Sequence, residues 1–329
     1  MKSGFDVPKY LWPDRRRLLV GAGALLAGTA VAPLRAGEPR RLLHVDSYHR
    51  GNEWNDRIAA AVEKALQGSG VTFRIEHMDT KRRDSEADKQ AAARDIVEVI
   101  DSYQPHVVTT SDDNAVKYVL MPYYRNADLP FVFCGVNWDA SGYGLPYANA
   151  TGMVEVSPIP QIVEWLKRNA NGPRLGFLAE DTPTKHKEMN YHERLFGIGY
   201  HTTYFVSDFP GWLDAFRAAQ TEVDMLMLLG VGRLTEWDAD VARRVAEDET
   251  RIPTGTDFAW LMPYSLFGIG KLPEEQGEWV AEAALKILDG VSPRDIPVTH
   301  NVRGELLFNP RIAATIGIKR RPPLARVIE

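Results

Sequence analysis

Three residue types that could form a nucleophilic triad stand together near the start of the chain. Asp46, Ser47 and His49 lie in the stretch LLHVDSYHRGNEWND, residues 42–56, where an apolar run gives way to polar residues. A triad needs its acid, base and nucleophile in one hydrogen-bonded line, and neighbours on a single strand-to-helix turn diverge. The sequence also contains no G-x-S-x-G elbow. We therefore predict that this turn lines a binding pocket, and we expect no catalytic residue.

The sequence gives only weak signals for a metal-binding site or a nucleotide-binding site. His44 and Asp46 share one strand face without an obvious third ligand. His186 and His192 are six residues apart on a predicted helix and therefore face different sides of it. The stretch LLGVGRLTE, residues 228–236, follows a strand as phosphate loops do, but it lacks the rest of a nucleotide fingerprint. We predict neither a metal nor a cofactor.

The single cysteine, Cys134, is predicted to be a structural residue. Cys134 lies in the apolar run LPFVFCGVN and has no second cysteine with which to form an internal disulfide. Burial as a structural thiol explains it better than a nucleophilic role.

The elements that must position these residues alternate between strand and helix. The first series consists of strands predicted at 41–46, 71–79, 105–111 and 129–136, with helices at 53–70, 85–104 and 112–124. The second series consists of strands at 152–156, 174–181, 200–207, 224–231 and 252–257, with helices at 157–170, 184–197, 211–220 and 235–248. This alternation predicts an α/β protein of two doubly wound parallel-sheet lobes joined by a hinge.

The Gly- and Asn-rich stretch at 137–152 reads as the connector between the lobes. The predicted domain boundaries are 40–139 plus 258–298 for the first lobe, 140–257 for the second lobe, and 299–329 for a C-terminal hinge segment of uncertain lobe. Several chain crossings would then act as a hinge, with a ligand between the lobes.

The first 36 residues read as an export signal. Arg15, Arg16 and Arg17 precede an apolar run from Leu18, and a small-residue cleavage site ends at Ala36. The pattern resembles a twin-arginine signal, and an ordinary Sec signal is the alternative. No cysteine stands near the cleavage site, so we expect a periplasmic protein that is not a lipoprotein.

Composition sets the broad class. The chain has 329 residues, of which 44% are hydrophobic and 25% are charged, which is ample for two globular cores. A formal net charge of -5 argues against nucleic-acid binding, which needs a basic face. After the N-terminus, no apolar run is long enough to span a membrane.

Ligands of open parallel sheets bind beyond the carboxyl ends of the strands. Applied to the predicted strands, this rule selects hydroxyl, carboxylate, glycine and aromatic residues from both lobes. The predicted ligand-binding residues are Ser47, Tyr48, Trp54, Ser111, Asp112, Asn137, Asp181, Thr182, Gly230, Arg233, Asp257 and Trp260. Capping of the following helix is a competing explanation for Ser111, Asp112 and Thr182.

Four stretches carry a resemblance to a known family. They are FVFCGVNWDA, ATGMVEVSPI, EWVAEAALKILDGVSPRDIPV and LLFNPRIAATIGI, within a likeness that runs from about residue 41 to the end. The chain resembles periplasmic substrate-binding proteins of ABC transporters, in the uncharacterised-transport branch with the type I binding fold. Phe308-Asn309-Pro310 departs slightly from the family pattern.

The resemblance implies a monomeric protein that captures a small molecule between two lobes without chemistry. Carried over by position, it places Ser47, Tyr48, Ser111, Asp112 and Asn137 on one side of the ligand, and Asp181, Thr182, Gly230 and Asp257 on the other. Delivery would be to an inner-membrane ABC permease. The stretch SYHRGNEW also resembles the extracellular part of sensor kinases, so a ligand-sensing subunit for a membrane histidine kinase is an alternative function. A third, distant alternative is an exported α/β hydrolase.

The ligand is expected to be amino-acid-like or a small aromatic molecule. Asp112 and Asp257 offer carboxylates to an amine, and Arg233 offers a guanidinium to a carboxylate. Tyr48 or Trp260 offers a ring on which an apolar body can stack.

Overall fold

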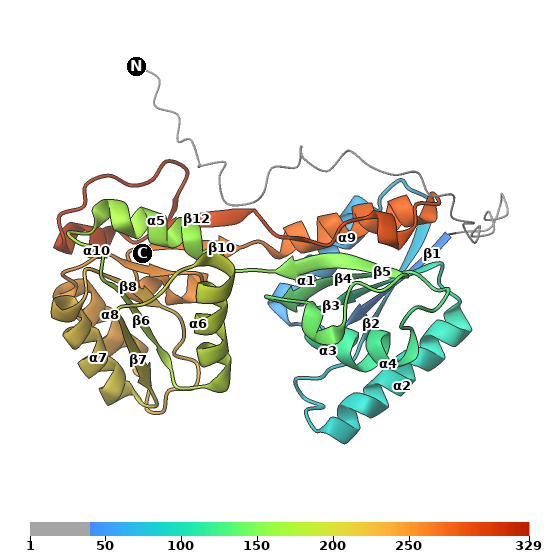
Figure 1. Cartoon of the computed structure of the whole chain (residues 1–329), viewed down its shortest axis with the longest axis horizontal. Coiled ribbons are helices and arrows are strands. Elements are labelled where there is room, and N and C mark those ends of the chain that lie inside the picture. The colour runs from blue at the N-terminus through green and yellow to red at the C-terminus, as the bar shows by residue number, and fades with distance from the viewer. Residues whose placement is uncertain (1–39, 329) are drawn as a thin grey trace, which may run out of the picture. The chain divides into compact units, whose positions relative to one another are not determined.

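The computed structural model describes residues 40–328. The expected export signal, residues 1–36, lies outside the described residues. The described chain forms two mainly parallel sheets, each covered by helices (Figure 1). Within 40–328, no helix combines the length and apolar character needed to cross a membrane.

The first sheet is parallel throughout and has the order β11-β5-β4-β3-β1-β2. Its strands are β1 (Arg40–Asp46), β2 (Val71–His77), β3 (Val107–Ser111), β4 (Phe131–Asn137), β5 (Ala150–Glu155) and β11 (Thr299–His300). From β1 the chain winds to β2 in one direction and through β3, β4 and β5 in the other. The direction therefore reverses between β1 and β3, and such a switch point opens a crevice at the carboxyl ends.

Helices α1 (Glu53–Ala65) and α9 (Pro273–Leu288) pack together on one face of this sheet. Their crossing is close, because a Cβ at Gly277 would lie 2.3 Å from the carbonyl oxygen of Ile58. Helix α2 (Glu86–Tyr103) shares the core of the other face. Cys134 of β4 is buried beneath α9, as predicted for a structural thiol.

The helix predicted at 112–124 is irregular. It divides into α3 (Asp112–Ala115), a π-helical turn (Val116–Leu120) and α4 (Met121–Tyr123). Pro122 has no N–H to donate to the preceding turn, which favours a local change of helical pitch.

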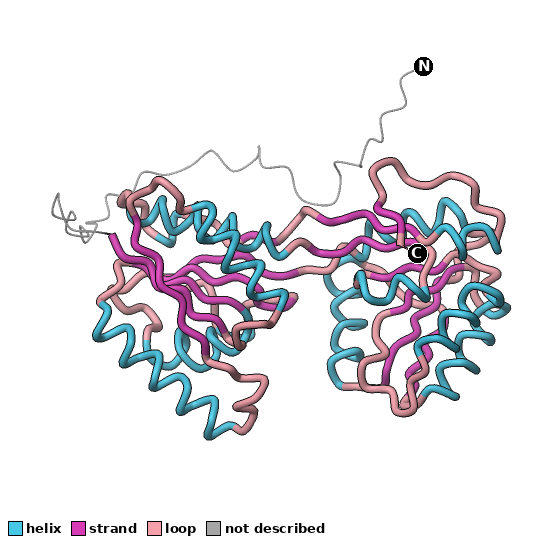
Figure 2. Tube along the Cα trace, turned by 180° about the vertical axis from the view of Figure 1, so that it is seen from behind, coloured by secondary structure: helices cyan, strands magenta, loops and turns pink. Residues whose placement is uncertain are grey.

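The second sheet has the order β13-β12-β10-β9-β8-β6-β7, and its β10–β12 pair is antiparallel. Its strands are β6 (Leu175–Glu180), β7 (Thr202–Val206), β8 (Met225–Leu228), β9 (Thr254–Thr256), β10 (Phe267–Lys271), β12 (Gly304–Phe308) and β13 (Arg326–Val327). Its helices are α5 (Ile159–Asn169), α6 (Pro183–Phe196), α7 (Phe209–Glu222), α8 (Ala239–Glu249) and α10 (Pro310–Thr315). Figure 2 shows the strands running between these helices. Trp212 and Phe216 of α7 are fully buried in the core of this lobe.

The chain passes between the sheets at points that differ from the predicted boundaries. β5 lies within the predicted second lobe, 140–257, yet it pairs with β4 of the first sheet. β10 lies within 258–298, which was assigned to the first lobe, yet it pairs with β9 of the second sheet. The stretch at 137–152 joins the end of β4 to the start of β5 through one short 3-10 helix, Ser141–Tyr143, and no α-helix. Its Gly- and Asn-rich sequence is equally typical of a linker between lobes. The C-terminal segment serves both sheets, through β11 in the first and β12 and β13 in the second.

Within residues 40–328, three crossings therefore join the lobes: after β5, after β10, and between β11 and β12. The Asn301 side chain accepts the N–H of Val156 at 2.7 Å and donates to its carbonyl at 3.0 Å, which ties the first crossing to the third. The Glu275 carboxylate accepts the N–H groups of Val302 and Arg303 at 2.9 and 2.8 Å, which ties the second crossing to the third. The connection between the lobes is thus a set of hydrogen-bonded segments.

Candidate functional site

The carboxyl edge of the first sheet is organised by Asn55, in the first turn of α1. Its buried Nδ2 donates to Asp46 Oδ1 at 2.5 Å, to Asp112 Oδ2 at 2.7 Å and to Ser111 Oγ at 3.3 Å. His77 Nδ1 lies 3.0 Å from the other oxygen of Asp46. The amide thus joins the carboxylate that ends β1 to the carboxylate that follows β3, on either side of the switch point.

Asp112 occupies an unusual backbone conformation and an unusual electrostatic environment. Its φ is +67°, a left-handed value that Asp tolerates better than most residues. Burial raises the pKa of its carboxyl well above the ordinary value, Glu155 adds to the increase, and the hydrogen bond from Asn55 opposes it. The predicted site residues Ser111 and Asp112 therefore lie in one buried polar network.

In the turn that suggested a triad, Ser47 and His49 make local contacts. Ser47 Oγ donates to the carbonyl of Ser111 at 2.5 Å and accepts the N–H of Ala115 at 2.8 Å. His49 Nδ1 lies 3.5 Å from Asp79 Oδ1. The Ser47 hydroxyl therefore ties the turn after β1 to the end of β3 and the end of α3, and its observed partners are backbone groups.

Tyr48 and Trp54 place aromatic rings near this edge. The Tyr48 ring lies 4.0 Å below the Lys81 ammonium, and the Tyr48 N–H donates to Asp46 Oδ1. Burial raises the pKa of the Tyr48 phenol, and the nearby carboxylates of Asp112 and Asp113 raise it further.

A buried charge cluster brings residues of both sheets together. Glu155 ends β5 in the first sheet, Lys271 ends β10 in the second, and their charged atoms lie 2.5 Å apart. The Lys271 ammonium also lies 5.8 Å from the Trp54 ring and 5.6 Å from the Phe258 ring. Burial lowers the pKa of Lys271, but Glu155 and Asp257 outweigh it and the net shift is upward. Lys271 is thus kept in its cationic form near two aromatic rings and two carboxylates.

Asp257 follows β9 and is the least satisfied member of this cluster. Asp257 is only 4% exposed, and its Oδ1 has no hydrogen-bond partner within residues 40–328. Burial raises the pKa of Glu188, which Asp257 raises further. Burial lowers the pKa of His192 to about 4, and Asp257 opposes that decrease. The Asp257 carboxylate therefore acts electrostatically on Lys271, Glu188 and His192.

Gly230 has a steric role beside the cluster. A Cβ at Gly230 would lie 2.6 Å from Cε of Lys185. The Lys185 ammonium lies 2.7 Å from Glu188 and 5.1 Å from the Phe258 ring. The missing side chain of Gly230 thus leaves room for a buried lysine that the sequence prediction did not include.

Two other predicted residues of the second lobe have local partners. Thr182 caps α6 by accepting the N–H of Lys185 at 3.3 Å, which is the competing explanation given above. Asp181 is half-exposed and pairs with His186 at 2.8 Å.

The remaining predicted residues lie at the margin. Asn137 donates to Asp113 at 2.7 Å. Arg233 contributes its backbone N–H to the Glu180 carboxylate at 2.6 Å, while the residue as a whole is exposed. Trp260 is 52% exposed and contacts the Phe258 ring at 5.7 Å.

The prediction missed Asn55, Glu155, Lys185, Glu188, Phe258 and Lys271. Glu155 and Lys271 are the last residues of β5 and β10, so the strand-end rule would have selected them with correct strand ends. Lys185 and Asn55 lie inside helices, and no sequence pattern distinguished them from ordinary helical residues. Among residues 40–328, no group of three or more His, Cys, Asp or Glu side chains is placed to hold a metal ion.

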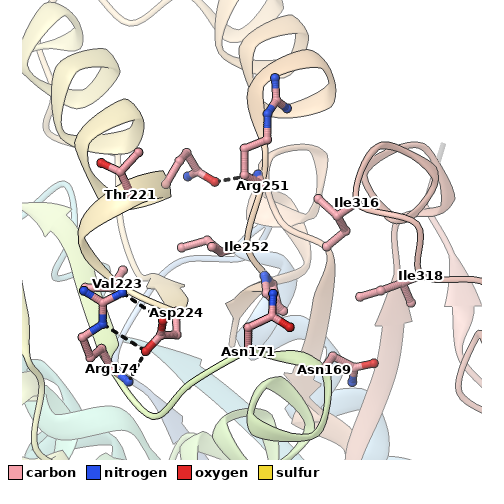
Figure 3. A pocket seen from close by; sticks show the side chains of 12 residues that line it. Asn169, Asn171, Arg174, Thr221, Val223, Asp224, Arg251, Ile252, Ile316 and Ile318 are labelled. Atoms are coloured by element: carbon pink, nitrogen blue, oxygen red, sulfur yellow. Dashed lines mark hydrogen bonds and ion pairs between the residues drawn. The ribbon is translucent and has the colours of Figure 1, made fainter.

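A pocket of about 380 Å³ lies elsewhere, at the amino ends of the strands of the second sheet (Figure 3). Arg174 and Asp224, which precede β6 and β8, form an ion pair at 3.0 Å on its wall. Ligands of open parallel sheets bind at the opposite ends, so we assign the candidate site to the charge cluster.

Comparison of sequences gives no relative. No protein-family model matches the chain. No curated protein matches it in sequence either.

Comparison of structures identifies the fold. The chain is similar to a substrate-binding protein with adhesive properties from Clostridium difficile, in its ligand-free, open structure, with a TM-score of 0.70 at 15% identity; the match covers 88% of this chain and 99% of that one. It is also similar to an ABC domain from Streptococcus pneumoniae in complex with L-Trp, with a TM-score of 0.57 at 16% identity, over 88% and 100% of the two chains.

A third similar structure is a carbohydrate transporter from Acidothermus cellulolyticus in complex with myo-inositol. Its TM-score is 0.50 at 12% identity, and the match covers 85% of this chain and 98% of that one. With the two wound sheets, these likenesses confirm the predicted α/β architecture: the chain has the two-lobed type I periplasmic-binding fold.

Proposed function

We propose that this protein binds a small molecule between its two lobes and presents the ligand-bound form to a membrane partner. The observation that carries the proposal is the charge cluster, in which Glu155 of the first sheet meets Lys271 of the second. Asp257 acts on the same lysine, and its Oδ1 has no hydrogen-bond partner within residues 40–328. A ligand at this point would contact both lobes, so its binding would favour one arrangement of the lobes over others.

The first candidate partner is an inner-membrane ABC permease, with the protein exported to the periplasm after cleavage near Ala36. The export signal in the sequence and the fold shared with substrate-binding proteins support this candidate. A monomer is sufficient, because both halves of the site come from one chain. The resemblance of SYHRGNEW to sensor domains keeps a membrane histidine kinase as the second candidate.

A binding role fits the chemistry of the site better than an enzymatic one. The Ser47 hydroxyl is engaged by backbone groups, and His49 lies beside Asp79. The aromatic rings of Trp54 and Phe258 flank a buried ammonium, an arrangement suited to enclosing a small organic ligand.

The ligand class that we propose is amino-acid-like or a small aromatic molecule. The Asp257 carboxylate offers a partner for the ammonium group of such a ligand, and the rings of Trp54 and Phe258 offer stacking surfaces. The similar Streptococcus structure is in complex with L-Trp, which is consistent with this class.

The test is a thermal-shift screen of the purified mature chain against amino acids, aromatic acids, amines and sugars, with calorimetry on each compound that stabilises it. Native mass spectrometry would identify any compound that co-purifies. Binding accompanied by a smaller radius of gyration in solution scattering would support the proposal. Absence of any bound or stabilising small molecule would contradict it, and stabilisation by sugars alone would contradict the ligand class.

A further inference from the structure

Buried oxygen atoms without a hydrogen-bond partner occur in both lobes, Thr110 Oγ1 and Ser265 Oγ among them. At the candidate site, the first lobe has such an atom in Oδ1 of Asn55, a fully buried residue. The second lobe has one in Oδ1 of Asp257, a residue 4% exposed. These statements refer to partners within residues 40–328. A buried acceptor without a donor is costly, so both atoms indicate a donor that the described chain does not supply.

The orientation of the Asn55 amide follows from charge. Its Nδ2 contacts the carboxylates of Asp46 and Asp112 at 2.5 and 2.7 Å. A reversed amide would place its oxygen against both carboxylates, which offer no N–H group. The atom of Asn55 that lacks a partner is therefore its oxygen, which accepts hydrogen bonds, as does the unpartnered Oδ1 of Asp257.

The buried lysines of the site are already paired. Lys271 contacts Glu155 at 2.5 Å, and Lys185 contacts Glu188 at 2.7 Å. These pairs balance one positive charge with one negative charge each. The carboxylate of Asp257 remains without such a pairing in the described residues.

The first-lobe edge is also rich in carboxylates. Asp112 and Asp113 follow β3, and both raise the pKa of the Tyr48 phenol, together with burial. The hydrogen bonds to these two carboxylates come from neutral donors, which are Asn55 for Asp112 and Asn137 and Tyr143 for Asp113. The hydrogen-bond partners of these two side chains thus bring no positive charge to this edge of the sheet.

We propose that the ligand is an organic cation whose ammonium or guanidinium N–H groups donate to Asp257 in the second lobe and to Asn55 in the first. These groups carry donors and no acceptor, which matches two unpartnered acceptors in an acidic setting. The rings of Trp54 and Phe258, already beside the Lys271 ammonium, are suited to line the ligand's path. This inference rests on the proposed binding function and specifies the ligand's charge.

The experiment compares primary amines, diamines and guanidinium compounds with zwitterionic, anionic and neutral compounds of similar size, by calorimetry on the mature chain. We expect the cations to bind and the affinity to fall as salt concentration rises. N-trimethylated analogues keep the charge but lose the N–H donors, so we expect them to bind at least tenfold more weakly.

Variants locate the contact. Asp257→Asn keeps the shape of the side chain and removes its charge, and we expect it to weaken cation binding at least tenfold. Asp240→Asn is the matched control, since Asp240 is an exposed carboxylate of the same lobe, on α8, and its variant should bind as the unmodified protein does. Circular dichroism and unfolding midpoints verify that both variants fold.

The outcomes separate this inference from the function on which it rests. If only zwitterionic, anionic or neutral compounds bind, or if Asp257→Asn binds cations as tightly as the unmodified protein, the inference is overturned while the binding function stands. If no compound of any class binds, both are overturned.

Discussion

At the scale of single residues, the site depends on side chains that hold charges in place. Asn55 joins two carboxylates, Gly230 makes room for Lys185, and Lys271 connects the two sheets. Most of these contacts are buried, where a lost partner leaves the other group unsatisfied and the cost is greatest.

The first residue-scale prediction concerns Asn55. Replacing it by Leu removes the donor shared by Asp46 and Asp112, so we expect the free energy of unfolding to fall by about 2–4 kcal/mol. Urea unfolding measures the change. Asn171→Leu, at an exposed position, is the control and should change the free energy by less than about 0.5 kcal/mol. Equal losses in the two variants would contradict the role assigned to Asn55.

The second residue-scale prediction concerns pH. Burial lowers the pKa of His192 from 6.5 to about 4, so the unfolded chain binds a proton on this residue before the folded protein does. The stability contributed by neutral His192 is therefore complete above pH 6.5 and is lost as the pH falls toward 4. The loss reaches about 3 kcal/mol at most.

His192→Gln tests this assignment, since glutamine keeps a polar group near Tyr200 and does not titrate. We expect the unfolding free energy of the unmodified protein to fall more steeply between pH 7 and pH 4.5 than that of the variant. Other groups, including buried His44 with its lowered pKa, contribute to both proteins and cancel in the difference. Parallel pH profiles would show that His192 does not titrate as described.

At the scale of elements, helix α9 returns from the second lobe to cover the first sheet, and its packing against α1 depends on one small residue. Gly277 lies so close to α1 that a Cβ would meet the Ile58 carbonyl oxygen at 2.3 Å and Ala61 Cβ at 2.8 Å. An alanine here must move the helices apart, which disturbs the element that carries Asn55.

We expect Gly277→Ala to destabilise the protein by about 1–3 kcal/mol, because overpacking at the crossing outweighs the better helix propensity of alanine. The control is Gly199→Ala, whose Cβ would have no neighbour within 4 Å. Thermal and urea unfolding measure both changes. A stabilised Gly277→Ala variant would mean that α1 and α9 are farther apart than the structure places them.

Sequence patterns predicted the elements better than their sheet membership. Alternating apolar strands and capped helices correctly predicted the two α/β series, including α1 and α2, because those signals are local. Assigning β5 to the first sheet depends on its pairing with β4, and the local pattern of Ala150–Glu155 suits either sheet. β10 was not predicted at all, because FGIGK is short and contains two glycines.

The same limit applies to the site. Asp112 follows one predicted strand and Asp257 is the last residue of another, so the strand-end rule selected them. Lys271 joins the site only through a strand that the pattern missed, and Glu155 through a strand end placed one residue too late. The pairing of these two residues spans more than a hundred positions, and no local signal encodes it.

At the scale of the whole chain, the crossings between the lobes and the candidate site are contiguous. Glu155 and Lys271, which form the charge cluster, each stand directly at a crossing, and Trp138 donates its N–H to the carbonyl of Glu155 at 2.9 Å. A ligand that changes the partners of these residues would therefore act directly on the segments between the lobes. Binding and lobe movement would then be coupled through a few hydrogen bonds.

The third crossing provides the test of this coupling. Asn301 accepts the N–H of Val156 and donates to its carbonyl, so Asn301→Ala leaves both backbone groups without that partner. We expect amide hydrogen exchange at Val156 to accelerate at least tenfold, while exchange within β4 and β8 stays unchanged. Asn169→Ala, which removes a side-chain contact to the Trp165 carbonyl in α5, is the control and should leave Val156 protected. Unchanged protection in Asn301→Ala would mean that other contacts hold the crossings together, and ligand binding would then have to act on the lobes by another route.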